Sequence, residues 1–95
     1  MILFRVTFQA QFGKAGELVE LLKQEPPQDV RGRLLTDLSG PFDTVVLETV
    51  VESVDAYFQQ LQEMFANQEM SEAMRQSYAL IASGHREFYT IEAET

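Results

Sequence analysis

The pattern of hydrophobic and polar residues predicts the same order of elements in both halves of the chain: a strand, a helix and a second strand. In the first half, the alternation of residues 2–9 and 31–38 predicts two strands, because side chains of a strand point to opposite faces in turn. Between them, the apolar stripe of residues 14–25 predicts a helix, which Pro26 and Pro27 end. Turn residues at 39–41 lead into the second half.

The second half repeats this order with a longer helical segment. Residues 42–51, rich in valine and threonine, predict a strand, residues 53–83 predict helix, and residues 86–92 predict a final strand. The apolar stripe of the helical segment changes phase near Asn67, so we expect a break into two helices there. Gly84 fits the position that follows the C-terminus of a helix.

The resulting order, βαββαβ, predicts one α+β domain over residues 1–95 with a ferredoxin-like fold. A four-stranded antiparallel sheet would carry the helices, the second of them broken, on one of its faces. The side chains expected to face the helices are Phe4, Val6, Phe8, Leu34, Leu38, Val45, Leu47 and Val51.

The opposite face of this sheet predicts a partner. A sheet face in contact with water is normally polar, but here leucine and valine are mixed with a few charges. An apolar surface of this kind indicates an interaction site, and a second copy related by a two-fold axis would cover it. We therefore expect a homodimer. The side chains expected on this face are Leu3, Arg5, Thr7, Arg33, Leu35, Asp37, Thr44, Val46, Glu48 and Val50.

Arg5 and Glu48 are charges inside otherwise apolar strands, and their strands are neighbours in the predicted sheet. Buried charges need a partner, so one interpretation is an Arg5–Glu48 ion pair inside the dimer. In the other interpretation they anchor a ligand carboxylate or carbonyl, a group that arginine binds through two parallel hydrogen bonds. Both interpretations stay open.

Aromatic and methionine side chains gather around the helix break. Most of them are expected in the core, but methionine also lines adaptable pockets, and a broken helix above a sheet can leave a cleft. Phe65, Met74 and Tyr89 are the expected ligand contacts there, together with Arg5 and Glu48.

The single histidine, His85, is the candidate acid–base group, because an imidazole titrates near neutral pH. Tyr57 or Tyr89 is the candidate hydrogen-bond donor beside it, and Arg5 is the candidate stabiliser of an anion. The alternative for His85 is an exposed side chain at a junction of helix and strand.

Two segments resemble a known superfamily. Residues 40–48 (GPFDTVVLE) are similar to the central strand of the dimeric α+β barrel proteins, and residues 83–92 (SGHREFYTIE) are similar to their last strand. Within that superfamily, the chain resembles small NIPSNAP-like and antibiotic-biosynthesis-monooxygenase-like proteins. The resemblance implies a homodimer whose sheets form a barrel, with clefts between sheet and helices.

The same superfamily includes cofactor-independent quinone-forming monooxygenases and haem-degrading monooxygenases. The haem-degrading members typically use an asparagine, a tryptophan and a histidine. This chain has no tryptophan and a single asparagine, Asn67. Haem chemistry is therefore not expected, and no cofactor is predicted.

The composition of the chain excludes several classes of binding partner and several kinds of site. With 15 acidic and 7 basic residues the formal net charge is -8, so nucleic acid and anionic membranes are not expected to bind. Cysteine is absent and histidine occurs once, so no disulfide and no metal site are predicted. No apolar run reaches the roughly 18 residues of a membrane span, and the N-terminus lacks the pattern of a signal peptide. We expect a cytoplasmic protein.

Three functions remain open from the sequence. The first is a homodimer that binds a small apolar or aromatic molecule in the cleft between sheet and helices. The second is a cofactor-independent monooxygenase or isomerase of a small cyclic substrate. The third is a structural or interaction dimer without a ligand, so the sequence leaves open whether the protein is an enzyme.

Overall fold

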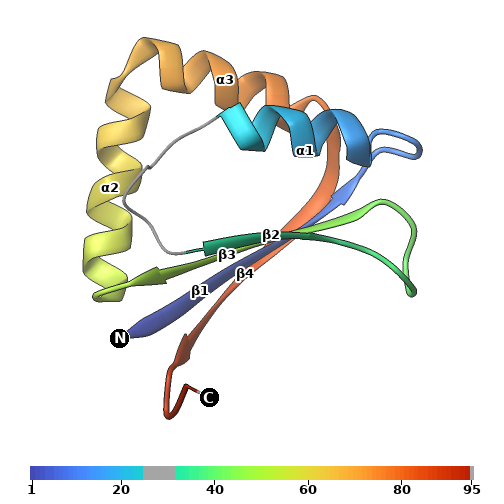
Figure 1. Ribbon diagram of the computed structural model, residues 1–95. Helices are drawn as coiled ribbons and strands as arrows, with labels where there is room; N and C mark the ends of the chain where they lie inside the picture. Colours follow the sequence, from blue (N-terminus) through green and yellow to red (C-terminus); the bar gives the residue numbers. More distant parts are fainter. Residues whose placement is uncertain (25–31, 95) are drawn as a thin grey trace.

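The computed structural model describes residues 1–24 and 32–94, and these form a four-stranded antiparallel sheet with three helices on one face (Figure 1). The predicted α+β, ferredoxin-like fold is confirmed. The helix end at Glu25, the stop at Pro26–Pro27 and the strand start at Arg31 lie outside the described residues. The elements in chain order are β1 (Ile2–Ala10), α1 (Ala15–Gln24), β2 (Gly32–Thr36), β3 (Thr44–Val51), α2 (Val54–Ala66), α3 (Gln68–Tyr78) and β4 (Ile81–Thr90).

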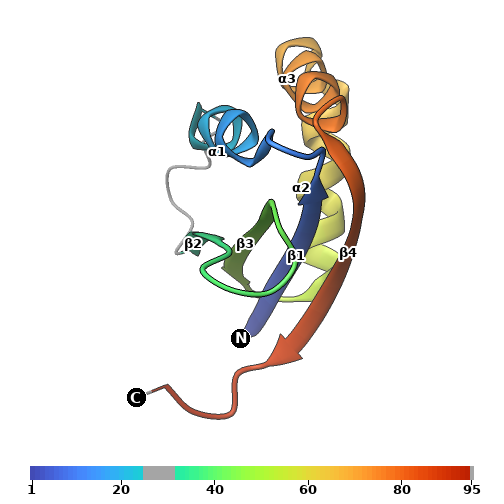
Figure 2. The same cartoon turned by 90° about the vertical axis from the view of Figure 1, so that its right-hand side faces the viewer.

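The strands lie in the order β2-β3-β1-β4, with the long β4 curving along β1 (Figure 2). Arg5 of β1 lies opposite Glu48 of β3 and opposite Glu87 of β4. Because alternate residues of a strand share a face, this register separates two surfaces. We call the helix-covered surface the inner face. The other, the outer face, carries Leu3, Arg5, Thr7, Arg33, Leu35, Val46, Glu48, Val50, His85, Glu87 and Tyr89.

The tightest part of the core lies where α1 packs on the sheet. Leu18 of α1 and Val45 of β3 are completely buried, and Ala10 joins them. Asp43, at a φ of 61°, accepts hydrogen bonds from the backbone N–H of Gly13 (2.9 Å) and of Ala15 (3.4 Å). The carboxylate of Asp43 therefore occupies free amides at the start of α1.

The predicted break of the long helical segment lies at Asn67. Ser53 caps the start of α2 by accepting from the N–H of Ala56 at 3.0 Å. Asn67 leaves the helical conformation (ψ 119°), and its N–H donates to the carbonyl of Met64. Its side-chain oxygen then accepts from the N–H of Glu69 at 3.0 Å. One asparagine thus ends α2 and starts α3.

The predicted end of the helical segment and start of the last strand are wrong. Helix α3 ends at Tyr78 and β4 begins at Ile81, so residues 81–83 are strand and Gly84 does not follow a helix. Gly84 lies in β4 opposite Phe8. A Cβ at Gly84 would be 3.1 Å from the Phe8 ring and 3.2 Å from the carbonyl oxygen of Thr7. The glycine therefore gives room to the Phe8 side chain.

The prediction that Leu38 faces the helices is also wrong. Strand β2 ends at Thr36, and Leu38 is fully exposed, with a relative exposure of 102%. Asp37 and Thr44 close the turn: each N–H bonds an oxygen of the other residue, at 3.1 and 3.0 Å. The chain leaves the sheet before Leu38. The alternation of residues at this point therefore does not predict which face of the sheet a side chain occupies.

Candidate functional site

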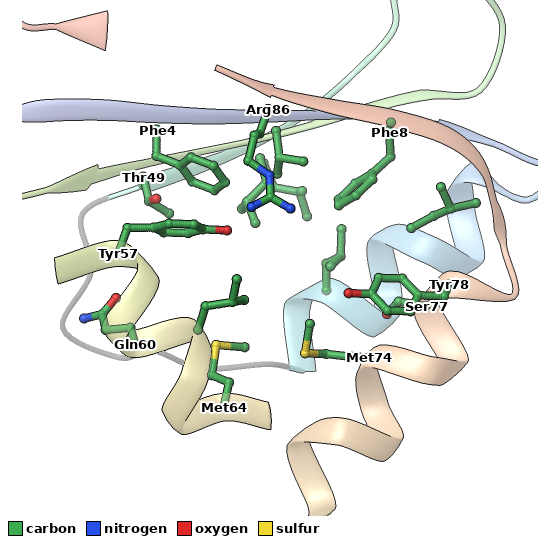
Figure 3. Close-up of a pocket in the computed structure, with 18 of the residues that line it drawn as sticks. Phe4, Phe8, Thr49, Tyr57, Gln60, Met64, Met74, Ser77, Tyr78 and Arg86 are labelled. Carbon is green, nitrogen blue, oxygen red and sulfur yellow. The ribbon is translucent and has the colours of Figure 1, made fainter. Parts of the chain in front are cut away.

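A cavity of about 650 Å³ lies between the inner face and the helices, and it is open to solvent. Phe4 and Phe8 of β1 form its roof in Figure 3. Met64 of α2 and Met74 of α3 border the opposite side. The walls are mainly apolar, which is typical of sites for small organic ligands.

Stacked aromatic rings hold α2 against the sheet at one end of the cavity. The ring of Tyr57 lies 4.1 Å from the Phe4 ring and 5.6 Å from the Phe88 ring, centroid to centroid. Phe4 and Phe88 are 5.2 Å apart. Tilted and edge contacts of this kind are favourable beyond their buried area. They position the Tyr57 hydroxyl inside the cavity (Figure 3).

Polar groups reach the cavity from several elements. Arg86 extends from β4 towards α2, and the hydroxyls of Tyr57 and Tyr78 point into the same space (Figure 3). Burial raises the pKa of Tyr57, and the positive charge of Arg86 opposes this rise only in part. The Tyr57 hydroxyl is therefore protonated at neutral pH and able to donate a hydrogen bond.

The outer face carries a second polar centre, in which Glu48 bridges two arginines. Nε of Arg5 lies 2.8 Å from Oε2 of Glu48. Arg33 binds Oε1 through Nε at 2.8 Å and through a terminal nitrogen at 2.6 Å. The Glu48 side chain is only 4% exposed, against 36% for Arg5 and 68% for Arg33.

This bridge sets the charge of Glu48. Burial alone would raise its pKa, but hydrogen bonds from Arg33 and Arg5 outweigh that effect and hold the pKa below the ordinary value. The same hydrogen bond to Glu48 raises the pKa of Arg5. Glu48 and Arg5 are therefore charged at neutral pH, and both arginines are paired with Glu48.

His85 and Tyr89 also lie on the outer face. Nε2 of His85 is 3.6 Å from a carboxylate oxygen of Glu87, and the Tyr89 hydroxyl donates to Glu87. That hydrogen bond is the first cause of the raised pKa of Tyr89. The Tyr89 ring in turn lies 5.3 Å from the guanidinium carbon of Arg5. A continuous polar network thus crosses the outer face.

The structure divides the predicted site residues between the two faces. Tyr57, Phe65 and Met74 border the cavity. His85 borders it only along β4, because its side chain alternates with the inner-facing Arg86. The structure does not bring the side chains of His85 and Tyr57 together. The remaining predicted residues, Arg5, Glu48 and Tyr89, lie on the outer face.

Sequence reasoning missed Arg86 as a cavity residue. The signal was the alternation of β4: Phe88 is apolar and inner-facing, so Arg86, two residues earlier, shares its face. The sequence prediction began the last strand at Arg86 and assigned Gly84 to the position after a helix. The alternation along β4 was therefore not recognised. A charge on an inner-face position was thereby overlooked.

Two further features concern metal binding and the membrane. Within residues 1–24 and 32–94, no group of three or more histidine, cysteine, aspartate or glutamate side chains is arranged to hold a metal ion. In the same part of the chain, no helix is long and apolar enough to cross a membrane.

Comparison with known proteins identifies solved structures that share this fold. No family model matches the sequence, and no curated protein sequence is detectably similar. The structure of an uncharacterized NIPSNAP domain protein from Burkholderia xenovorans is similar with a TM-score of 0.84 at 18% identity, over 98% of this chain and 96% of that chain. A NIPSNAP family protein from Agrobacterium tumefaciens reaches 0.83 at 16% identity, over 97% and 88% of the two chains.

A candidate antibiotic biosynthesis monooxygenase from Deinococcus radiodurans is also similar, with a TM-score of 0.68 at 17% identity over 100% of this chain and 96% of that chain. The chain therefore shares the fold of NIPSNAP-domain and antibiotic-biosynthesis-monooxygenase structures, the likeness that its sequence resemblance predicted. The TM-scores are higher for the NIPSNAP structures than for this monooxygenase-like one. At these identities the likeness concerns the fold alone.

Proposed function

We propose that this protein is a homodimer that binds a small apolar or aromatic molecule in the cavity between the inner face and the helices. The observation that supports this most is the cavity itself. Its volume of about 650 Å³ lies within the range of roughly 300–1,000 Å³ that is usual for small-molecule sites. Its walls combine aromatic rings with a few polar groups.

The helices over the cavity are suited to adapt to a ligand. Met64 and Met74 line it from α2 and α3, and methionine side chains adjust to irregular shapes. No described residue of α2 is buried, and Phe65 at its end is half exposed. A ligand that covers these side chains would remove apolar surface from water, which favours binding.

The proposal is tested with the uncharged fluorophore N-phenylnaphthylamine, whose emission rises in apolar surroundings. We expect saturable binding at micromolar concentration with one site per chain. Met74→Trp should weaken it by about tenfold or more, because the larger ring occupies the cavity; tenfold corresponds to ~1.4 kcal/mol. If the emission does not saturate as the fluorophore concentration rises, the result contradicts a defined binding site.

A matched variant controls for the introduced tryptophan. Phe12 is 85% exposed and is not among the cavity residues. Phe12→Trp should therefore leave the affinity for the fluorophore unchanged. If both variants bind like the unmodified protein, the ligand lies elsewhere and the cavity is not the site.

The outer face supports the dimer. Leu3, Val46 and Val50 are only partly covered there, and Leu35 is 37% exposed. The charged side chains of this face compensate one another: two arginines and two glutamates, Arg5, Arg33, Glu48 and Glu87. Two copies facing each other would therefore cover apolar side chains without opposing net like charge.

Other expectations of the sequence stay predictions. A cofactor-independent monooxygenase or isomerase that uses His85 with Tyr57 would need both groups at one ligand. Their side chains lie on opposite faces of the sheet, so the geometry favours binding over this acid–base pair. A cytoplasmic location, expected from the acidic composition, also remains a prediction.

A further inference from the structure

The cavity differs in charge from the rest of the molecule. The chain has 15 acidic residues and a net charge of -8. Yet none of the residues that the structure places around the cavity is an aspartate or glutamate. Its polar lining consists of hydroxyl and amide groups and of basic side chains. Among the described residues, the cavity lining thus carries no negative charge, although the protein is acidic.

Arg86 is the cation that faces this space. Each of the other described lysines and arginines has a carboxylate oxygen within 4.0 Å, whereas Arg86 has none among the described residues. The Arg86 guanidinium carbon lies 6.0 Å from the centroid of the Phe58 ring, a weak cation–π contact. The paired cations are Arg5, Lys14, Lys23, Arg33 and Arg75.

Among the described residues, one other arginine and one lysine border the cavity, and both have carboxylate partners. The guanidinium of Arg33 binds Glu48 on the outer face, and Lys23 lies 3.4 Å from Glu20 on α1. Of the described lysines and arginines, only Arg86 combines a position inside the cavity with N–H groups that no described carboxylate accepts. A ring contact on one face of a guanidinium leaves the donors at its edge available.

Two phenol hydroxyls reach the cavity near Arg86. Figure 3 shows the hydroxyls of Tyr57 and Tyr78 pointing into the cavity from opposite sides of the Arg86 side chain. Because burial raises the pKa of Tyr57, that group remains a donor at neutral pH. A guanidinium with a neighbouring phenol is a suitable receptor for a carboxylate or a similar oxyanion, which accepts several hydrogen bonds.

We infer that the ligand is an amphipathic anion: an apolar or aromatic body in the methionine-lined part of the cavity, with a carboxylate-type group bound by Arg86. This inference rests on the proposed function, because it specifies the ligand class of the same cavity. The anion supplies a negative charge that none of the described lining residues provides. Arg86 then sets specificity, since an uncharged analogue of the same shape leaves its N–H groups unpaired.

The test compares two probes of nearly equal shape, pyrene butyrate and its uncharged amide, pyrene butyramide, by fluorescence titration at neutral pH. We expect the unmodified protein to bind the carboxylate about tenfold more tightly than the amide, because charge-assisted hydrogen bonds are strong. In Arg86→Met this preference should disappear while the affinity for the amide stays the same. Arg86→Lys, which keeps the charge but loses the planar fork, should fall between them.

Arg75→Met is the matched control. It removes one positive charge from an exposed side chain of α3 that does not line the cavity. The tenfold preference should persist in this variant, which separates the local contact from the overall charge. Circular dichroism of all variants checks that the fold is kept, and the amide affinity reports an intact cavity.

The outcomes separate this inference from the proposed function. If the unmodified protein binds both probes equally, or if Arg86→Met keeps the preference for the carboxylate, the role of Arg86 is overturned and the cavity as an apolar site is retained. If the unmodified protein binds neither probe, the proposed function itself is overturned, and the inference with it.

Discussion

The two faces of the sheet use the same residue type in opposite ways. On the outer face, Arg5 and Arg33 share the buried carboxylate of Glu48, and their charges are satisfied within the chain. On the inner face, Arg86 reaches a cavity without a described acidic residue. A paired arginine has its charge satisfied within the fold, whereas an arginine that reaches a cavity without a described ionic partner is available to a ligand. The difference between the faces therefore indicates the inner-face cavity as the place to test for ligand binding.

The largest expected effect concerns the outer face as an interface between copies. In Val46→Asp, a charge without a partner would enter the interface, which costs several kcal/mol. We expect the homodimer to become a monomer at micromolar concentration, measured by light scattering. Leu38→Asp is the control, since Leu38 is fully exposed and outside the sheet. An unmodified protein that is already monomeric would refute the dimer.

Removing the carboxylate of Glu48 disrupts the ion pairs of the outer face. Glu48→Gln leaves two arginines side by side without an anion, and we expect the free energy of unfolding to fall by about 2 kcal/mol, the order of a hydrogen bond to a charged group. Urea denaturation measures this. Glu63→Gln, on an exposed position of α2, should change it by less than about 0.5 kcal/mol. Equal effects of both substitutions would show that the bridge contributes nothing.

The same bridge predicts a pH dependence. The pKa of Glu48 is lower in the folded state than the unfolded value of about 4.3, so its charge stabilises the fold above that value. This contribution is lost as pH falls below about 4, through the folded pKa. The stability difference between the unmodified protein and Glu48→Gln should thus be constant from neutral pH to about pH 5 and shrink below it. A difference that grows on acidification would contradict the assignment.

The smallest effect directly compares arginines of the two faces. Arg33→Met removes a paired but largely exposed side chain and should cost about 1 kcal/mol or less, because solvent screens such pairs. Arg86→Met removes no ion pair among the described residues and should leave the free energy of unfolding within about 0.5 kcal/mol. Its consequence should appear in ligand affinity instead. If Arg86→Met is the more destabilising of the two, Arg86 has a structural role.

Local signals predicted most of the elements. The alternation of β1, the valine and threonine content of β3, the helical stripe of α1 and the phase change at Asn67 all agree with the structure. The prediction was wrong where two local patterns compete. Residues 81–83 continue a helical stripe, but their backbone pairs with β1 instead, and Gly84 makes room for Phe8 rather than following a helix.

The candidate site was predicted less completely for a physical reason. The sequence by itself determined the order of the elements, because side-chain period and turn residues act over a few neighbouring positions. It also indicated that Arg5 and Glu48 belong together. Only the tertiary structure decided which charges are paired: Arg5 and Arg33 lie 43 and 15 residues from Glu48 in sequence, and strand register brings them into contact. The same register turns Arg86 inward, towards a cavity that exists only after the helices pack on the sheet.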